Sequence, residues 1–187
     1  MNLTYTNDLE YINKIEKFYI NSFPKEERFS FDILKECSNE DNSDLYVILD
    51  NNIFIGMCFL VNCDNAYYLM YLAVEPNLRN KGYGSKILND LKCKYKTIFL
   101  SVDYNEDIVS IKRKKFYLKN GFYKTNKIYE DTGVLYEVLC TNQEYEITEN
   151  NMRKRYSNMT NNSSIYKKIS DTFNTNKIIF INQKQVK

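Results

Sequence analysis

The chain of 187 residues contains no histidine. This absence excludes the Ser–His and Cys–His nucleophile mechanisms and the common histidine-based zinc sites. It also excludes histidine as a general base, so any acid–base chemistry must use Tyr, Asp, Glu, Lys, Cys or water. One missing residue type thus removes several widespread catalytic mechanisms.

Long apolar segments are missing as well. No stretch approaches the roughly 20 apolar residues that a helix needs to span a bilayer. The first residues, Met1–Tyr5, lack the basic segment followed by an apolar one that marks a signal peptide. The formal net charge is +2, too small by itself to indicate a nucleic-acid or membrane partner. We therefore expect a cytoplasmic protein with neither of these partners.

The sequence also lacks a C-x-x-C pair, and its cysteines are odd in number. They are Cys37, Cys58, Cys63, Cys93 and Cys140. This pattern favours reduced, mostly buried thiols in a cytosolic protein and indicates no metal site.

What is present suffices for one domain with a core, because 43% of the residues are hydrophobic and 15% are aromatic. The composition changes after Cys140. Residues 141–187 are rich in Asn, Ser, Thr and Lys and carry eight basic against four acidic residues. We expect a domain over residues 1–140. Residues 141–187 are then a polar, basic, loosely packed appendage of unknown role, in which 152–156 can form a helix and 178–181 a strand.

Apolar spacing and turn residues indicate alternating helices and strands. Helices are expected over about 8–20, 30–37, 83–95 and 107–120, and strands over 45–49, 53–61, 67–74, 97–103, 122–129 and 134–140. Gly56 suggests a bulge, and Gly121 is a natural residue to follow a helix end. Residues 67–103 read as a strand, a helix and a strand, which makes the two strands parallel.

The most informative segment runs from Leu69 to Ile87. An apolar strand stops at Pro76, a short polar loop with Gly82 and Gly84 follows, and a helical pattern begins at once. Such a turn into a helix N-terminus binds phosphate through backbone N–H groups. The spacing does not fit a P-loop, and Ile87 stands where a dinucleotide-binding fingerprint has its third glycine.

Two blocks of sequence carry a family resemblance. The run Arg79-Asn80-Lys81-Gly82-Tyr83-Gly84 resembles the R/Q-x-x-G-x-G/A pyrophosphate motif of the GNAT superfamily of N-acetyltransferases. The run from Phe116 to Phe122 is similar to the F-Y-x-K-x-G-F signature that ends the last helix of that family. Both blocks have the expected order and spacing, and the resemblance is strong over residues 67–122.

The resemblance implies an α/β (α+β) fold. Its sheet is mixed and mostly antiparallel, with helices on both faces, and a central parallel βαβ pair splays apart at the cofactor site. It also implies acetyl-coenzyme A as the cofactor. The backbone of the first strand of that pair would hold the pantetheine arm, and the loop would hold the phosphates. The residues so assigned are Leu72, Ala73, Val74, Arg79, Asn80, Lys81, Gly82, Tyr83, Gly84 and Ser85.

The catalytic residues implied by the resemblance are Tyr117 and Asp103. Tyr117 occupies the position of the family's general acid in the second block. A glutamate common on the second splayed strand is replaced by Ser101, and Asp103 follows two residues later on the same face. Glu75 is the alternative base, and ordered water is a further one.

Other charged residues near the implied site are open to more than one interpretation. Glu26 and Glu27 lie in the connector that borders the acceptor cleft of the family, where they could attract a cationic amine or simply be solvated. Ser110 and Arg113 stand where the family often has Asn and Ala. The basic run 112–115 could meet the 3′-phosphate of coenzyme A, but for most of it we expect an exposed helix face.

The sequence therefore predicts transfer of acetyl from acetyl-coenzyme A to a primary amine, small molecule or peptide, by a monomer or homodimer. The alternative is a non-catalytic acyl-coenzyme A-binding or sensor module of the same fold. A third interpretation, nucleic-acid binding through residues 112–115 and the basic tail, ranks last because no aromatic interleaving or known motif supports it. The acceptor's identity is not determined by these residues.

Overall fold

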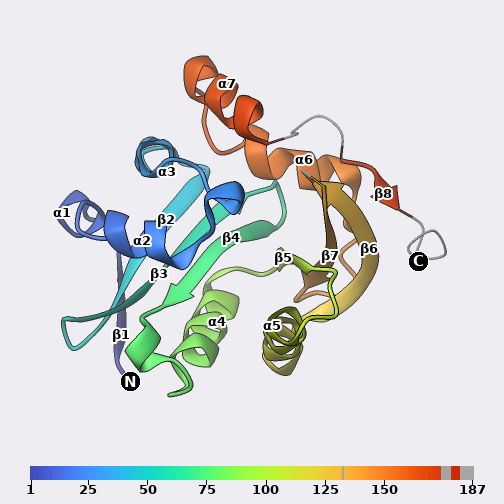
Figure 1. Ribbon diagram of the computed structural model, residues 1–187. Helices are drawn as coiled ribbons and strands as arrows, with labels where there is room; N and C mark the ends of the chain where they lie inside the picture. Colours follow the sequence, from blue (N-terminus) through green and yellow to red (C-terminus); the bar gives the residue numbers. More distant parts are fainter. Residues whose placement is uncertain (132, 174–177, 182–187) are drawn as a thin grey trace.

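A single eight-stranded sheet forms the centre of the computed structural model, which describes residues 1–131, 133–173 and 178–181 (Figure 1). The strand order is β1-β2-β3-β4-β5-β7-β6-β8, and every neighbouring pair is antiparallel except β4 and β5. The strands are β1 (Leu3–Thr6), β2 (Ser43–Asp50), β3 (Ile53–Asn62), β4 (Tyr67–Val74), β5 (Ile98–Asp103), β6 (Tyr123–Asp131), β7 (Val134–Cys140) and β8 (Phe180–Ile181).

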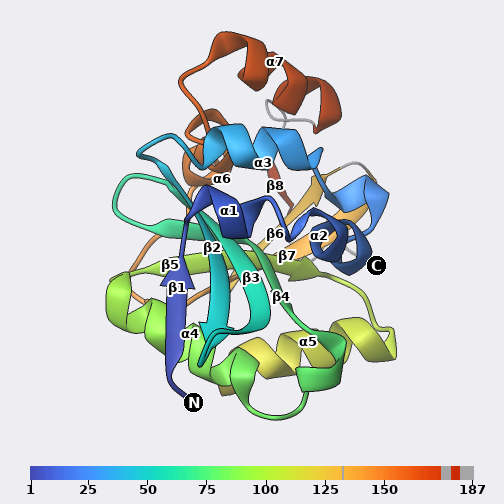
Figure 2. The same cartoon turned by 90° about the vertical axis from the view of Figure 1, so that its left-hand side faces the viewer.

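Helices cover both faces of this sheet, as expected (Figure 2). The helices are α1 (Leu9–Ile12), α2 (Glu16–Ser22), α3 (Phe31–Cys37), α4 (Tyr83–Lys94), α5 (Ile108–Lys119), α6 (Glu149–Ser157) and α7 (Ser163–Thr172), with 3₁₀ turns η1 (Lys25–Glu27) and η2 (Pro76–Leu78). One hydrophobic cluster joins the sheet to α1–α3, α6 and α7. A second joins it to α4 and α5. The fold class predicted from sequence is confirmed.

Two details at the N-terminal end differ from the expectation. The single helix expected over residues 8–20 is broken into α1 and α2, because Lys14 and Ile15 donate their N–H groups to Tyr11 and Ile12 in tighter i→i−3 bonds. Ser30 lies at the N-cap position of α3, but its side chain accepts no capping hydrogen bond. The core contact of this segment is nevertheless apolar, since Ile12 and Ile15 are both buried.

The parallel pair opens after only two residue pairs. Tyr67 pairs with Ile98 and Tyr68 with Phe99, and no later residues of β4 and β5 are paired. A bulge in β4 begins right there: the register against β3 shifts between Leu69 and Tyr71, so Met70 is the extra residue. Because a bulge bends its strand and increases the twist, it turns β4 away from β5 at the point where pairing ends.

The bulge expected at Gly56 is also present. Ile48 pairs with Gly56 but Leu49 pairs with Phe54, which leaves one extra residue in β3. A Cβ at Gly56 would collide with the carbonyl oxygen of Ala73 in β4, so the two backbones approach more closely than any side chain would allow.

The tail is packed rather than loose, contrary to the expectation. Its described part contributes buried apolar side chains to the cluster beneath α1–α3, namely Ile147, Met152, Tyr156, Met159, Ile165, Ile169, Phe173 and Ile178. The expected helix at 152–156 lies within α6, and the late strand is confirmed at β8, which pairs with β6. Few aliphatic residues suffice here because large aromatic and thioether side chains fill the interface. The division of the chain at residue 140 stays a prediction.

The remaining expectations concern turns, thiols and membrane spans. Gly133 has a φ of 82° after β6, while Thr132 of the same expected turn lies outside the described residues. All five cysteines are free, and only Cys93 is exposed. In the described ranges, no helix has the length and apolar character that crossing a membrane requires.

Candidate functional site

The loop between β4 and α4 presents a row of backbone amides. Asn80 and Gly82 adopt positive φ values of 60° and 87°, and Gly82 is the N-cap residue of α4. Within the described part of the chain, none of the amides from Asn80 to Ser85 donates a hydrogen bond. Unbonded N–H groups at a helix N-terminus favour an anion, because the helix dipole adds a partial positive charge.

The side chains of this loop have separate environments. The Arg79 Nε–H donates to the Val74 carbonyl oxygen at 3.1 Å, so the guanidinium lies over the end of β4. Lys81 is exposed. The Tyr83 hydroxyl donates to Asp50 Oδ2 at 3.0 Å, which ties the first turn of α4 to the end of β2. The loop is therefore anchored at both ends.

The two sequence blocks that carried the resemblance touch each other. A Cβ at Gly84 would lie 3.0 Å from Cζ of Phe116, closer than side chains normally pack. Gly84 thus lets the first turn of α4 rest on the Phe116 ring of α5. The second block ends α5 with a Schellman motif, in which Gly121 N–H bonds to Leu118 O and Phe122 N–H to Tyr117 O.

The backbone of β4 faces the opening at alternate residues. Glu75 N–H donates to Ile55 O in β3, so alternation turns the backbone groups of Leu72 and Val74 toward the side that β5 has left. The carbonyl of Ala73 points instead toward Gly56 of β3. The expected contact of Ala73 with the cofactor stays a prediction.

Tyr117 is held in an aromatic pocket on α5. Its ring lies 5.3 Å from that of Phe116 and 5.5 Å from that of Phe122, measured between centroids, with interplanar angles of 63° and 69°. Burial raises the pKa of the Tyr117 phenol to about 12, although the positive charge of Arg113 acts in the opposite direction. The phenol is therefore protonated, as a proton donor has to be.

Asp103, at the carboxyl end of β5, is bound by the two residues that depart from the family pattern. Arg113 Nη1 donates to Asp103 Oδ2 at 3.0 Å, and the Ser110 hydroxyl donates to the same oxygen at 3.3 Å. Ser110 is also bonded to Asp107, the N-cap of α5. The carboxylate and both substitutions thus form one cluster that joins β5 to α5.

A second carboxylate lies near this cluster. Burial raises the pKa of Glu27 in η1, and the charge of Asp103 raises it further. The η1 backbone is fixed by Tyr71, whose hydroxyl donates to the Glu27 carbonyl at 3.0 Å. Burial also raises the pKa of Tyr136, the β7 residue that pairs with Asp103, and the charges of Glu27 and Asp103 add to that shift.

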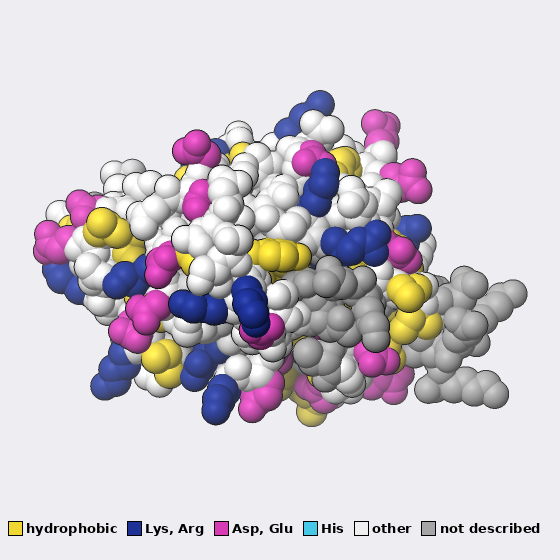
Figure 3. Space-filling view, turned by 90° about the horizontal axis from the view of Figure 1, so that it is seen from above, with side chains coloured by type: hydrophobic (Ala, Val, Ile, Leu, Met, Phe, Trp, Pro, Cys, Tyr) yellow, Lys and Arg dark blue, Asp and Glu magenta, His cyan; other side chains and the backbone are white. Residues whose placement is uncertain are grey.

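The basic run is mostly exposed, as expected. Lys112, Arg113 and Lys115 are exposed, whereas Lys114 forms an ion pair with the buried Glu137 of β7. The opposite side of the molecule, viewed from α7 in Figure 3, carries basic and acidic side chains side by side, outside the grey atoms.

Sequence reasoning missed the environment of Ser101. Its hydroxyl accepts a hydrogen bond from the Tyr129 hydroxyl at 2.9 Å, and Tyr129 in turn accepts one from Arg155 of α6. Arg155 is only 2% exposed. A run of basic residues in a polar tail gives no local signal that one of them is buried in the core.

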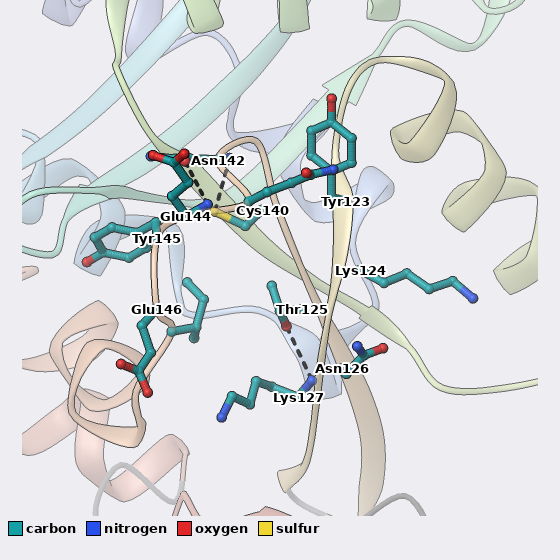
Figure 4. Close-up of a pocket in the computed structure, with 12 residues that line it drawn as sticks. Tyr123, Lys124, Thr125, Asn126, Lys127, Cys140, Asn142, Glu144, Tyr145 and Glu146 are labelled. Carbon is teal, nitrogen blue, oxygen red and sulfur yellow. Dashed lines mark hydrogen bonds between the residues drawn. The ribbon is translucent and has the colours of Figure 1, made fainter.

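A hollow of about 460 Å³ lies elsewhere, between the start of β6 and the segment after β7 (Figure 4). It forms because residues 125–127 bulge out of β6 between the Lys124–Leu139 and Ile128–Glu137 pairs. Polar side chains of both charges line it, among them Lys124, Lys127, Glu144 and Glu146. None of the residues assigned to the site from sequence borders this hollow.

Taken together, the fold and the loop define an α/β protein that can bind a phosphate-bearing ligand at the carboxyl ends of diverging parallel strands. Residues 41–124 match the model of the Acetyltransferase (GNAT) domain. This part of the chain is therefore similar to a GNAT acetyltransferase domain. The matched residues include β4, the loop, α4, β5 and α5.

Solved structures share this fold. A protein of Bacteroides thetaiotaomicron assigned to the GNAT family is 25% identical with a TM-score of 0.66, over 75% of this chain and 86% of that one. An aminoglycoside 6′-N-acetyltransferase complexed with coenzyme A is 14% identical with a TM-score of 0.63, over 79% and 100%. A chimeric spermidine N-acetyltransferase from Vibrio cholerae is 17% identical with a TM-score of 0.61, over 76% and 97%. No curated protein sequence matches the chain significantly.

Proposed function

We propose that the protein transfers an acetyl group from acetyl-coenzyme A to a primary amine by direct attack on the thioester. The observation that carries this proposal is the opening between β4 and β5 beyond the Tyr68–Phe99 pair, with unbonded loop amides following the end of β4. The residues that match the GNAT acetyltransferase domain span both features. Coenzyme A bound to a solved structure of the same fold supports the cofactor.

The cofactor would lie along β4. The amides of Asn80 to Ser85 would bind the pyrophosphate, with Arg79 and Lys81 adding charge-assisted bonds. The outward backbone groups of Leu72 and Val74 would bind the pantetheine arm as an added strand does. Arg79 would keep the end of β4 and the loop together through its bond to the Val74 carbonyl.

The chemistry needs one proton donor and one acceptor. The neutral amine attacks the thioester carbonyl carbon, a C–N bond forms and the C–S bond breaks. Tyr117 donates its phenolic proton to the departing thiolate, and Asp103 accepts the proton that the amine nitrogen loses. A positioned acid of this kind typically contributes ~10²–10⁴-fold to the rate. Tyr117 reacquires its proton from solvent readily, because its raised pKa favours the neutral phenol.

Asp103 can accept that proton only after its ion pair with Arg113 is exchanged for the incoming amine. Glu27 supplies a second carboxylate nearby, which would attract a protonated amine to this end of the opening. Solved structures of the same fold are acetyltransferases of spermidine and of aminoglycosides, and both names denote amines. This supports an amine as the class of acceptor.

Calorimetry with coenzyme A tests the cofactor, and Gly82→Ala is the informative variant. Gly133→Ala is its matched control, since Gly82 and Gly133 have φ values of 87° and 82° and a Cβ strains both similarly. We expect weakened coenzyme A binding only in Gly82→Ala. Failure of the folded, unmodified protein to bind coenzyme A or its acyl esters would overturn the proposal.

Turnover is measured separately, as release of thiol from acetyl-coenzyme A in the presence of a panel of amines. Release that depends on the amine is the expected result. Tight binding without release on any amine would instead favour the acyl-coenzyme A sensor. The ion pair between Arg113 and Asp103 would then explain why no carboxylate acts as the general base.

A further inference from the structure

A buried guanidinium links the tail to the point where the sheet opens. Arg155 of α6 donates from Nη2 to Asp131 Oδ2 at 2.8 Å and from Nη1 to the Tyr68 hydroxyl at 3.1 Å. It also donates to the Tyr129 hydroxyl. Its Cζ lies 4.5–5.1 Å from the ring centroids of Tyr68, Tyr129 and Tyr156, so three aromatic rings surround the charge.

The partners of Arg155 lie on both sides of the opening. Tyr68 belongs to the last residue pair that joins β4 to β5. Ser101 lies in β5, two residues beyond Phe99, which is the partner of Tyr68. The Tyr129 hydroxyl links Ser101 to the guanidinium. The Arg155 side chain therefore connects the last paired residue of β4 to the part of β5 that no longer pairs with β4.

Geometry and charge both make this link rigid. A guanidinium is planar and presents its donors in a fixed fork, so the positions of its hydroxyl and carboxylate partners are set relative to one another. Burial makes the link hard to break, because a charge without its partners would face an apolar interior. The Tyr156 hydroxyl closes the cluster by donating to Asp131 Oδ2 at 2.9 Å.

The geometry points to Arg155 as a positioning residue that sets the width of the opening between β4 and β5. Among the described residues, its hydrogen bonds and ring contacts include neither the loop 80–85 nor Tyr117, and it acts through Tyr68, Tyr129 and Ser101. This inference rests on the proposed function, since the opening matters as the place where the thioester would lie. It assigns a role to the tail: α6 locks the two halves of the sheet at the spacing that the pantetheine arm requires.

The test compares two ligands that share the adenosine, the 3′-phosphate and the first 5′-phosphate, but only one of which carries the pantetheine arm. Coenzyme A would occupy both the loop after β4 and the opening between β4 and β5, whereas 3′,5′-ADP would occupy only the loop. We expect Tyr129→Phe, which removes one hydroxyl, and Arg155→Met to weaken coenzyme A binding about tenfold or more, because a displaced β4 or β5 would lose backbone contacts with the arm. Binding of 3′,5′-ADP should change less than about twofold, because the loop is unaltered.

Ile169→Ala is the control for simple destabilisation. Ile169 is fully buried in α7 of the same tail, so its truncation lowers the melting temperature, and it should leave the ratio of the two affinities unchanged. An unchanged ratio of coenzyme A affinity to 3′,5′-ADP affinity in Tyr129→Phe would overturn the inference. Because Tyr129→Phe is the milder substitution, it provides the test if Arg155→Met fails to fold. If the unmodified protein binds neither ligand, the proposed function falls and the inference with it. If it binds both and the ratio never moves, only the inference falls.

Discussion

The two faces of the sheet are stabilised in different ways. On the α4–α5 face, apolar packing such as that of Gly84 on Phe116 is joined by polar contacts whose basic partner is partly exposed, such as Lys114 with Glu137. On the tail face, a buried charge joins residues as far apart as Tyr68 and Arg155, 87 positions along the chain. The comparison teaches that the face with the recognisable motif is not the one that fixes how the sheet is held open.

Removing the phenol of Tyr117 tests whether the α4–α5 face carries the chemistry. Tyr117→Phe should lower kcat ~10²–10⁴-fold while leaving coenzyme A affinity nearly unchanged, because the ring stays and only the proton donor is lost. In the unmodified enzyme, Tyr117 should cause no loss of kcat near pH 10, where an ordinary tyrosine ionises, since burial raises its pKa to about 12. Steady-state kinetics over pH measures both. Full activity in Tyr117→Phe would exclude the residue from the mechanism.

Neutralising Asp131 tests the tail face. Asp131→Asn leaves the Arg155 guanidinium buried without its ionic partner, and we expect about 3–5 kcal/mol less stability. Urea unfolding measures the change, with Asp171→Asn as control. Asp171 pairs with Lys167 on the exposed side of α7, where both side chains are more than 60% exposed, and its loss should cost well under about 1 kcal/mol. Equal effects of the two variants would contradict the stabilising role of the buried pair.

Packing across the two motif blocks gives the next smaller effect. Gly84→Ala places a Cβ 3.0 Å from the Phe116 ring, and we expect it to cost about 1–3 kcal/mol through overpacking. A double-mutant cycle with Phe116→Leu checks the cause. If the ring is responsible, the cost of Gly84→Ala falls when Phe116 is shortened; additive costs would show that the helix turn itself resists the Cβ.

The sequence predicted the α4–α5 face well, for a physical reason. Apolar periodicity, Pro76 and the glycines are local signals, and they placed β4, α4 and α5 within a residue or two of their bounds. The bond between Asp103 and the Ser110–Arg113 pair was not predicted, although all three residues had been noted. Their meeting depends on how α5 docks against the end of β5, which no local pattern specifies.

The tail was predicted poorly for the complementary reason. Its composition is polar, and polarity usually means solvent. Burial of Arg155 requires Asp131 and three tyrosine rings that come from β4, β6 and α6, so its environment exists only in the folded chain. The bulge at Met70 was missed likewise, since no glycine or proline marks it and only the register against β3 shows it.

The smallest expected effect sharpens the comparison within one helix. Lys154 precedes Arg155 in α6 and pairs with Asp64 in the β3–β4 turn, with side chains 30% and 49% exposed. Asp64→Asn removes the charge while keeping a residue type that tolerates its φ of 67°, so strain is not introduced. We expect at most about 1 kcal/mol of lost stability, fading at high salt because exposed charges are screened. A loss of stability as large as that of Asp131→Asn, or one that does not depend on salt, would contradict this expectation. Solvent exposure would then not explain the different strengths of the Lys154–Asp64 and Arg155–Asp131 ion pairs.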